Sequence, residues 1–398
     1  MLDSRHLADI QLATALRDCR QRTLALVEDL NDAQWLPAKQ SGTNPIAWEL
    51  AHIAWFAEFF ILRGPHCRDE LGFAHAKHAP QFAGPDALFD SARLAHHARW
   101  GAPMPPRAEL AEILSNQLEA CIAAIPDTAH LSLQSADEAL YFHRLALFHE
   151  DMHSEAFCAM RALMGYCAPA SITAKPVASS HLLSIEASQV QIGIGANASG
   201  FFFDNEYPSH TVVLPDFMIE SAPTTAGEFA KFVNDGGYEN LSYWPGEAGA
   251  WRKQTEFSHP HRWRRNSVGD WQMRWFELWI DLDPRSAAIH LNAFEAQAYC
   301  LWAGRRLPTA AEWEHAAQTN PAFTWGNSVW EWTSDAFAPY SGFQPGPYRE
   351  YSQPWFNNHR ELRGGAFATH QRMHHPSYRN FFQAHRNDVF AGFRTVAT

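Results

Sequence analysis

The chain has 398 residues, a length that favours two domains, and its 43 acidic and 31 basic residues leave a net charge of −12. This balance argues against a nucleic-acid-binding protein, because such proteins need an excess of Lys and Arg to neutralise phosphates. No stretch approaches the roughly 18 apolar residues of a membrane span, and the charged N-terminus does not resemble a signal peptide. Six scattered cysteines without a CxxC pair indicate a reducing, cytoplasmic compartment rather than a disulfide framework.

The first 170 residues have helical periodicity. Apolar side chains at spacings of three and four predict helices over 8–32, over 46–63 after the start signal Thr43-Asn44-Pro45, over 107–125 and over 135–165. We expect these four helices to form an up-and-down bundle. The segment 64–106 is rich in Pro, His and Gly and is expected to be irregular.

The composition changes after residue 170. We expect a linker over 171–186 and a second domain over 187–398, so that the bundle occupies 1–170. Short strand-like runs at 190–194, 210–214 and 217–220 and short helices at 225–235, 292–303 and 309–317 predict a loop-rich α+β domain. From residue 318 onward the periodicity gives little sign of regular structure.

One histidine pattern points to a metal. His149 and His153 lie four residues apart within a predicted helix, so their imidazoles can bind one ion. His52 lies in an apolar stretch of another helix and needs a polar partner, and bundle cores build metal sites from facing helices. Three neutral imidazoles would leave coordination positions open, as non-heme iron or catalytic zinc requires.

The residues alone leave other interpretations open. His52 could be a hydrogen-bonded core histidine, and His149 and His153 could lie on a solvated face. HEDMH at 149–153 also matches the HExxH motif of zinc hydrolases, in which Glu150 would be the general base. That motif requires a third ligand downstream, and Glu155 follows too closely to converge on the pair. His66, His75, His78, His96, His97 and His143 are expected on the surface or in loops.

Longer motifs resemble a known family. NPIAWELAHIAWFAEFF (44–60) and HEDMHSE (149–155) are similar to the iron-ligand segments of the ergothioneine-type synthases. FDNEYPSH (203–210), AGRRLPTAAEWEHAA (303–317), WEWTSDAF (330–337), LRGGAFAT (362–369) and RNFFQAHRNDVFAGFR (379–394) resemble the formylglycine-generating-enzyme and sulfatase-modifying-factor domain. The resemblance implies a DinB-like four-helix bundle followed by a loop-rich, C-type-lectin-like domain.

The resemblance also implies a chemistry. In this family three histidines hold iron(II), and they correspond here to His52, His149 and His153. The substrate is hercynine, the trimethylated betaine of histidine, and with O2 the enzyme forms a carbon–sulfur or carbon–selenium bond at the imidazole C2 carbon. We therefore expect iron(II) as cofactor, O2 as co-substrate and small molecules as partners.

Further site residues are implied in the second domain. Asn380, Phe381 and Arg386 match the family's hercynine pocket, where aromatic faces suit a quaternary ammonium and an Asn or Arg suits a carboxylate. Tyr348 and Tyr351 resemble a tyrosine pair near the iron, with Tyr340 as a competitor. By contrast, Arg363, Gly364, Gly365, Trp330, Trp332 and the run 305–308 are expected to maintain the fold.

Three departures bear on the chalcogen donor. The stretch 88–107 offers Arg93, Arg99 and Arg107, but not at the spacing that members acting on γ-glutamylcysteine use for its carboxylates. Phe382 replaces an acid, and Met152 replaces a glutamine beside the last ligand. These changes favour a neutral selenosugar donor, as in the selenoneine-synthase branch, with Arg93 and its neighbours Asp90, His96, His97 and Trp100 near it. The alternative is ergothioneine synthesis from γ-glutamylcysteine or cysteine.

Three other functions are weighed against this one. Formylglycine generation is disfavoured, because it requires a C-terminal cysteine pair and no Cys follows Cys300. An HExxH zinc hydrolase and a non-catalytic ligand-binding protein are the remaining alternatives.

Overall fold

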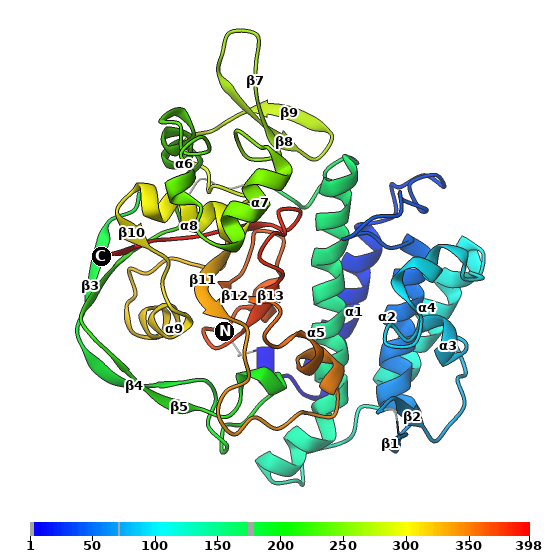
Figure 1. Cartoon of the computed structure of the whole chain (residues 1–398). Coiled ribbons are helices and arrows are strands. Elements are labelled where there is room, and N and C mark those ends of the chain that lie inside the picture. Colours follow the sequence, from blue (N-terminus) through cyan, green and yellow to red (C-terminus); the bar gives the residue numbers. More distant parts are fainter. Residues whose placement is uncertain (1–3, 71, 174–178) are drawn as a thin grey trace. The chain divides into compact units, whose positions relative to one another are not determined.

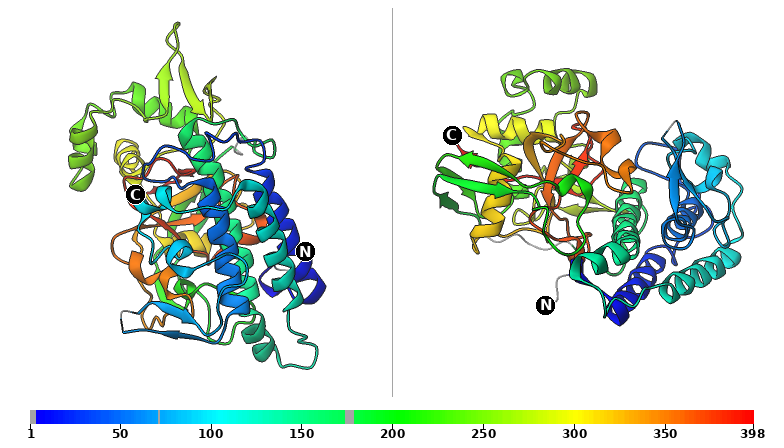
Figure 2. Two further views of the ribbon diagram at one scale, coloured as in Figure 1. Left: turned by 90° about the vertical axis from the view of Figure 1, so that its right-hand side faces the viewer. Right: turned by 90° about the horizontal axis from the view of Figure 1, so that it is seen from below.

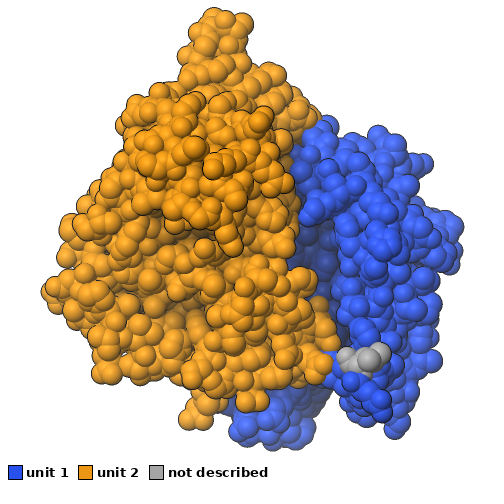
Figure 3. Space-filling view, viewed as in Figure 1, with its two compact units in different colours: residues 1–169, 199–201 blue, residues 170–198, 202–398 orange. Residues whose placement is uncertain are grey.

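The computed structural model describes residues 4–70, 72–173 and 179–398. The chain divides into two compact units, residues 1–169 with 199–201 and residues 170–198 with 202–398, which are coloured separately in Figure 3. Residues 174–178, within the predicted linker, lie outside the described residues.

The first unit contains four long helices, as the periodicity predicts. They are α1 (Asp9–Ala25), α2 (Ile46–Ala57), α4 (Arg107–Ala123) and α5 (Leu133–Met164). Helix α1 packs against α5, and α2 packs against both α4 and α5 (Figures 1 and 2). The Ser132 side chain caps the start of α5, and Gly165, in the left-handed region at φ 66°, ends it.

Helix α1 ends seven residues before the predicted limit. The carbonyls that follow it are bound by arginines from other helices: Arg161 donates to Leu26, and Arg107 donates to Val27 and Leu30. These side chains replace the helical hydrogen bonds, so the chain can turn away at Leu26.

The predicted helix over 46–63 consists of α2 and a π-helical turn that continues it (Glu58–Leu62). The described residues of the stretch predicted to be irregular, 64–106, contain only short elements. These are the hairpin β1 (His66–Arg68) and β2 (Ala74–Ala76), α3 (Asp86–Phe89) and a 3₁₀ turn (His96–Gly101).

A short excursion of the chain, 199–201, belongs to the first unit. The Gly200 N–H donates to Asp137 (2.7 Å), the Phe201 N–H donates to the Arg5 carbonyl (2.9 Å), and the Phe201 ring stacks on Phe148 of α5.

The second unit is the predicted loop-rich α+β structure. Its helices are α6 (Ala226–Asn234), α7 (Glu247–Thr255), α8 (Ala293–Trp302) and α9 (Ala310–Thr319). Capping boxes begin three of them, with Thr225 and Glu228 before α6, Asn292 and Glu295 before α8, and Thr309 and Glu312 before α9. Helix α7 was not predicted, because its sequence lacks a side-chain cap and buries only Ala248, too little for an apolar stripe.

Four sheets complete this unit. Their strand orders are β10-β15-β6-β3, β13-β12-β11-β14, β4-β5 and β7-β8-β9. The strands are β3 (Leu182–Ile185), β4 (Ser188–Ile192), β5 (His210–Leu214), β6 (Phe217–Glu220), β7 (Trp263–Arg265), β8 (Trp271–Trp275), β9 (Leu278–Asp281), β10 (Arg305–Arg306), β11 (Trp330–Ala336), β12 (Arg360–Gly364), β13 (Asn380–Phe382), β14 (Ala391–Gly392) and β15 (Val396–Ala397).

Two expectations for this unit are wrong. Strand β3 lies within the stretch expected to be a linker, where it pairs antiparallel with β6. The region after 318 contains the sheet β13-β12-β11-β14, which is largely buried on both faces, so its strands lack the alternation that reveals a half-exposed strand.

Candidate functional site

The three predicted histidines form one cluster in the first unit. Each offers a ring nitrogen, and these atoms lie within 4.8 Å of one another. His52 comes from α2, whereas His149 and His153 lie one turn apart on α5, with their Nε2 atoms 3.2 Å apart. Among the residues the structure describes, this is the group of His, Cys, Asp or Glu side chains whose geometry suits a metal ion.

Hydrogen bonds from the far side of two rings orient them. His52 Nδ1 lies 2.7 Å from the Phe89 carbonyl, to which it donates, and His153 Nδ1 lies 2.8 Å from Glu49 Oε1. A histidine whose Nδ1–H is bonded in this way presents Nε2 as the basic atom, which is the arrangement found around protein-bound metals. His149 is held instead by the Phe56 ring, stacked 3.6 Å away and nearly parallel.

Burial favours the neutral form of two of these imidazoles, His52 and His149. It lowers the pKa of His52 from 6.5 to about 3, and together with the neighbouring His153 it holds the pKa of His149 well below the usual value. Burial, the largest single influence, would raise the pKa of Glu49, but the hydrogen bond from His153 and the electrostatic influence of His153, Asn44 and His52 together outweigh it, so the pKa lies below normal. Neutral imidazoles are the form that binds a metal.

Glu49 was missed by the sequence analysis, although a signal was present. It stands three positions before His52 on the same helix, so both side chains can reach one site. A carboxylate at this spacing in an otherwise apolar segment needs a buried partner, and His153 is that partner.

The structure does not support the zinc-hydrolase interpretation of HEDMH. Glu150 is turned to α1, where its carboxylate forms a two-bond ion pair with Arg20 (2.7 and 3.1 Å) and both side chains are about 5% exposed. Asp151 likewise binds Arg22 (3.1 Å). The acid that would act as general base therefore serves the packing of α1 on α5.

Other predictions about the first unit have mixed outcomes. Met152 is half-buried on α5 directly before His153. Arg93 is bound to Asp90 (3.1 Å) and to the Ala74 carbonyl (2.9 Å). The expected exposure of His143 is wrong, because α4 covers it and its Nε2 bonds the Cys121 carbonyl.

The second unit gathers three of its six predicted site residues, Tyr348, Tyr351 and Phe381, into an aromatic cluster. Tyr351 stacks on Phe203 (centroids 4.3 Å apart), lies 6.3 Å from Tyr348 and meets Phe381 edge-on. Phe381 in turn stacks on Phe337. The cluster also contains Tyr378, which the sequence analysis missed.

Tyr378 constrains one of the candidate acids. Its hydroxyl lies 2.8 Å from that of Tyr351, and burial together with this neighbour holds the pKa of Tyr351 well above 10. Tyr348 is half-buried.

The polar pocket candidates lie on and after β13. Asn380 accepts the Phe381 N–H at its own Oδ1 (2.8 Å). Arg386 lies over the Phe382 ring, 5.4 Å from its centroid, and is paired with Asp388 through two bonds of 2.5 and 2.6 Å.

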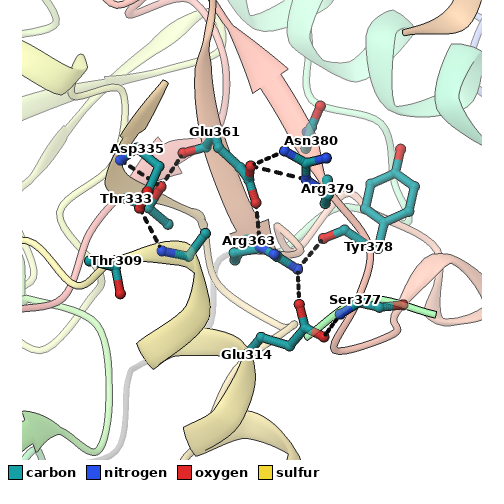
Figure 4. A network of polar contacts seen from close by, with 12 residues as sticks. Thr309, Glu314, Thr333, Asp335, Glu361, Arg363, Ser377, Tyr378, Arg379 and Asn380 are labelled. Carbon is teal, nitrogen blue, oxygen red and sulfur yellow. Dashed lines mark hydrogen bonds and ion pairs between the residues drawn. The ribbon is translucent and has the colours of Figure 1, made fainter. Parts of the chain in front are cut away.

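The competing tyrosine, Tyr340, belongs to the fold rather than to this cluster. Its hydroxyl accepts a bond from Arg363, and burial raises its pKa to about 12. Arg363 pairs with Glu314 (3.0 Å) and Glu361 (2.7 Å), and Glu361 also binds Arg379 (2.6 Å), all nearly inaccessible to solvent (Figure 4). The network fastens α9 to β12, in agreement with the structural role expected for Arg363.

Family models match both units. Residues 15–156 match the DinB superfamily, and residues 169–329 and 324–398 match the sulfatase-modifying factor enzyme 1-like domain. The fold and the histidine cluster therefore define a two-domain protein with a DinB-like helical domain followed by a sulfatase-modifying-factor domain. No helix among the described residues is long and apolar enough to cross a membrane.

Curated relatives extend the match to the whole chain. The hercynine oxygenase of Mycobacterium tuberculosis is 30% identical over 96% of this chain and 98% of its own length, and that of Mycolicibacterium thermoresistibile is 29% identical over 96% and 94%. The formylglycine-generating enzyme of Streptomyces coelicolor is 26% identical over 44% of this chain. The protein is an enzyme, and it belongs to the hercynine oxygenase family.

Proposed function

We propose that this protein is a non-heme iron(II) enzyme that uses O2 to join a chalcogen to the imidazole C2 carbon of hercynine, with a selenosugar as donor. The cluster of His52, His149 and His153 carries the proposal, because it brings three imidazole nitrogens together and hydrogen bonds at Nδ1 orient two of the rings, His52 and His153. The names of the full-length relatives supply the substrate.

The cluster fits iron(II). Imidazoles suit this ion, and three protein ligands leave positions open on a six-coordinate metal. When bound, iron(II) supplies adjacent positions for the substrates and O2 and the electrons that activate O2. The Glu49 carboxylate and the Phe89 carbonyl supply the outer partners that metal-binding histidines require.

The second unit supplies the groups we assign to the substrate. Phe381 and Phe382 offer aromatic faces for the trimethylammonium group. Because Asn380 holds its Oδ1 on the Phe381 N–H, its Nδ2 hydrogens are the donors we assign to the carboxylate. Arg386 also carries a positive charge there, balanced by Asp388.

Tyr348 and Tyr351 are the candidate proton donors. The Tyr351 hydroxyl is buried and hydrogen-bonded to that of Tyr378, so the two hydroxyls share one bond in which either can be the donor. Tyr348 is half-buried, which favours it as the group that meets a substrate.

Contacts of the stretch 88–107 support a donor without carboxylates. Arg93 is paired with Asp90, Arg99 donates to Asn44, and Arg107 donates to the Leu30 carbonyl. Each of the three guanidiniums that could anchor a zwitterionic dipeptide is thus bound within its own unit, whereas a neutral sugar needs no such anchor. The net reaction joins C2 and selenium with loss of their two hydrogens, one oxygen atom ending on selenium and the other in water.

The experiment that tests this proposal is turnover after anaerobic loading with iron(II). Hercynine and O2 are supplied with a selenosugar or with γ-glutamylcysteine in separate reactions, and the products are read by mass spectrometry. We expect the selenium adduct from the sugar. A sulfoxide from the thiol alone would overturn the donor assignment, and no product from either would overturn the reaction.

Variants of the cluster test the ligands separately. His52→Ala, His149→Ala and His153→Ala should each lose bound iron and turnover. His143→Gln is the matched control, because His143 is also a buried histidine on α5 but bonds only the α4 carbonyl of Cys121 among the contacts described. Full iron binding in any of the three alanine variants would remove that histidine from the ligand set.

A further inference from the structure

The segment 86–101 lies along one stripe of the ligand helix. The stripe consists of Trp48, His52 and Trp55, which share a face of α2, preceded by Asn44, which lies two residues before the helix begins at Ile46. Each of them is bonded to the segment: Asn44 to Arg99, Trp48 to the Leu88 carbonyl, His52 to the Phe89 carbonyl and Trp55 to Asp86. A stretch expected to contact the donor is therefore also the outer wall of the metal site.

Arg99 is the residue of this segment that contacts both Trp48 and Asn44. Its guanidinium lies 4.1 Å from the centroid of the Trp48 ring, and its Nη1 donates to Asn44 Oδ1 at 2.9 Å. Two short paths lead from these contacts to two different histidines.

The first path runs through Trp48. The Trp48 ring is stacked on the His52 imidazole, with centroids 5.2 Å apart and planes 6° apart. The Trp48 Nε1–H, bonded to Leu88, prevents the indole from turning. The Arg99 guanidinium over the same indole favours this placement by cation–π attraction, so Arg99 restricts the plane in which His52 can lie.

The second path runs through Asn44 and Glu49. The Asn44 side chain interacts with the Glu49 carboxylate, which in turn accepts the Nδ1–H of His153. Arg99 fixes the Asn44 side chain by taking its Oδ1, which turns the Nδ2 hydrogens toward Glu49.

We infer that Arg99 is a positioning residue for the metal site, acting on His52 through Trp48 and on His153 through Asn44 and Glu49. The inference rests on the proposed function only in taking the three histidines as metal ligands. It assigns Arg99 to the protein's own ligand shell rather than to the chalcogen donor.

The test measures Co(II) binding to the purified full-length protein, with Co(II) alone as the probe. Arg99→Met should weaken Co(II) binding about tenfold, the lower end of the range for loss of an outer partner, and should change the visible absorption of bound Co(II). Arg99→Lys keeps the charge but loses the planar guanidinium, and it should restore the affinity only in part.

Arg107→Met is the matched control. Arg107 also lies 4.1 Å from the centroid of a tryptophan, Trp35, and donates to backbone carbonyls, but it has no path to the histidines. The Arg107→Met variant should bind Co(II) with the affinity and absorption spectrum of the wild type. If Arg99→Met has the affinity and spectrum of Arg107→Met, the inference is wrong.

Two further measurements keep the inference testable. In a double-mutant cycle with Glu49→Gln, the effects of the two changes should be less than additive, because both act on His153. If Arg99→Met does not fold, Asn44→Ala interrupts the second path alone. Unchanged Co(II) affinity in Asn44→Ala would overturn the second path. Co(II) binding without turnover on hercynine would refute the proposed reaction only, whereas absence of Co(II) binding would refute the metal site and this inference together.

Discussion

Substituting Glu150→Gln tests whether the glutamate of HEDMH is structural or catalytic. The change removes the negative charge that faces Arg20 through two bonds inside the first unit. Breaking a buried ion pair by removing one partner costs about 3–5 kcal/mol, because the remaining charge stays out of water. Arg20 keeps its bonds to the Leu114 carbonyl and Gln117, and the new amide retains one acceptor, so we expect about 3 kcal/mol.

The assay is urea unfolding followed by the helical circular dichroism signal. With an m-value of about 1–3 kcal/mol/M, a loss of this size lowers the unfolding midpoint by about 1–3 M. Glu119→Gln is the matched control, since Glu119 forms a similar two-bond pair with Arg17 that is about half exposed (side chains 54% and 47%) and should shift the midpoint little. Unchanged stability in Glu150→Gln, with turnover lost, would refute this reasoning and restore the hydrolase interpretation.

Three further predictions concern pH, the second unit and the tyrosines. The metal-free protein should lose stability as the pH falls below about 6.5. In the unfolded chain His52 then binds a proton, whereas in the folded protein burial lowers its pKa to about 3 and it stays neutral. The loss from His52 alone is about 2 kcal/mol at pH 5, and His52→Asn should flatten the pH profile of the urea midpoint. Arg363→Met leaves Glu314 buried without its cation and Glu361 with Arg379 alone, and it should cost about 3–5 kcal/mol in urea unfolding. Arg305→Met, which breaks a pair of 3.9 Å at a partly exposed site, should cost much less, and equal costs would contradict a structural role for the network. If Tyr348 donates the proton, Tyr348→Phe lowers kcat much more than it changes KM, and Tyr351→Phe and Tyr378→Phe lower kcat less. The reverse order of kcat values would assign the proton to the buried pair of Tyr351 and Tyr378.

Local periodicity was sufficient for the elements that carry the cluster. His149 and His153 share a face because α-helical geometry brings residues four apart together, whatever the rest of the chain does. The starts of α6, α8 and α9 were equally readable, since their capping boxes satisfy backbone groups within four residues. The resemblance of longer motifs to known families then allowed the two domains and their order to be predicted.

Buried strands and long-range polar pairs were not readable. Strands β11 and β12 lack alternation because both of their faces are covered, and the segment 86–101 has no period that reveals its carbonyls lying against α2. The same limit applies to His143. The sequence analysis placed it at the surface, but packing against α4 buries it.

The sequence by itself determined the four helices, the spacing of the three histidines and the two-domain order, because each depends on neighbours along the chain or on whole motifs. Only the tertiary structure decided what the polar side chains around them do. Glu49 and Glu150 are both buried acids on ligand-bearing helices, yet one holds His153 and the other holds Arg20. The direction each carboxylate takes is set by which helix packs against it, and that information is absent from any local stretch of sequence.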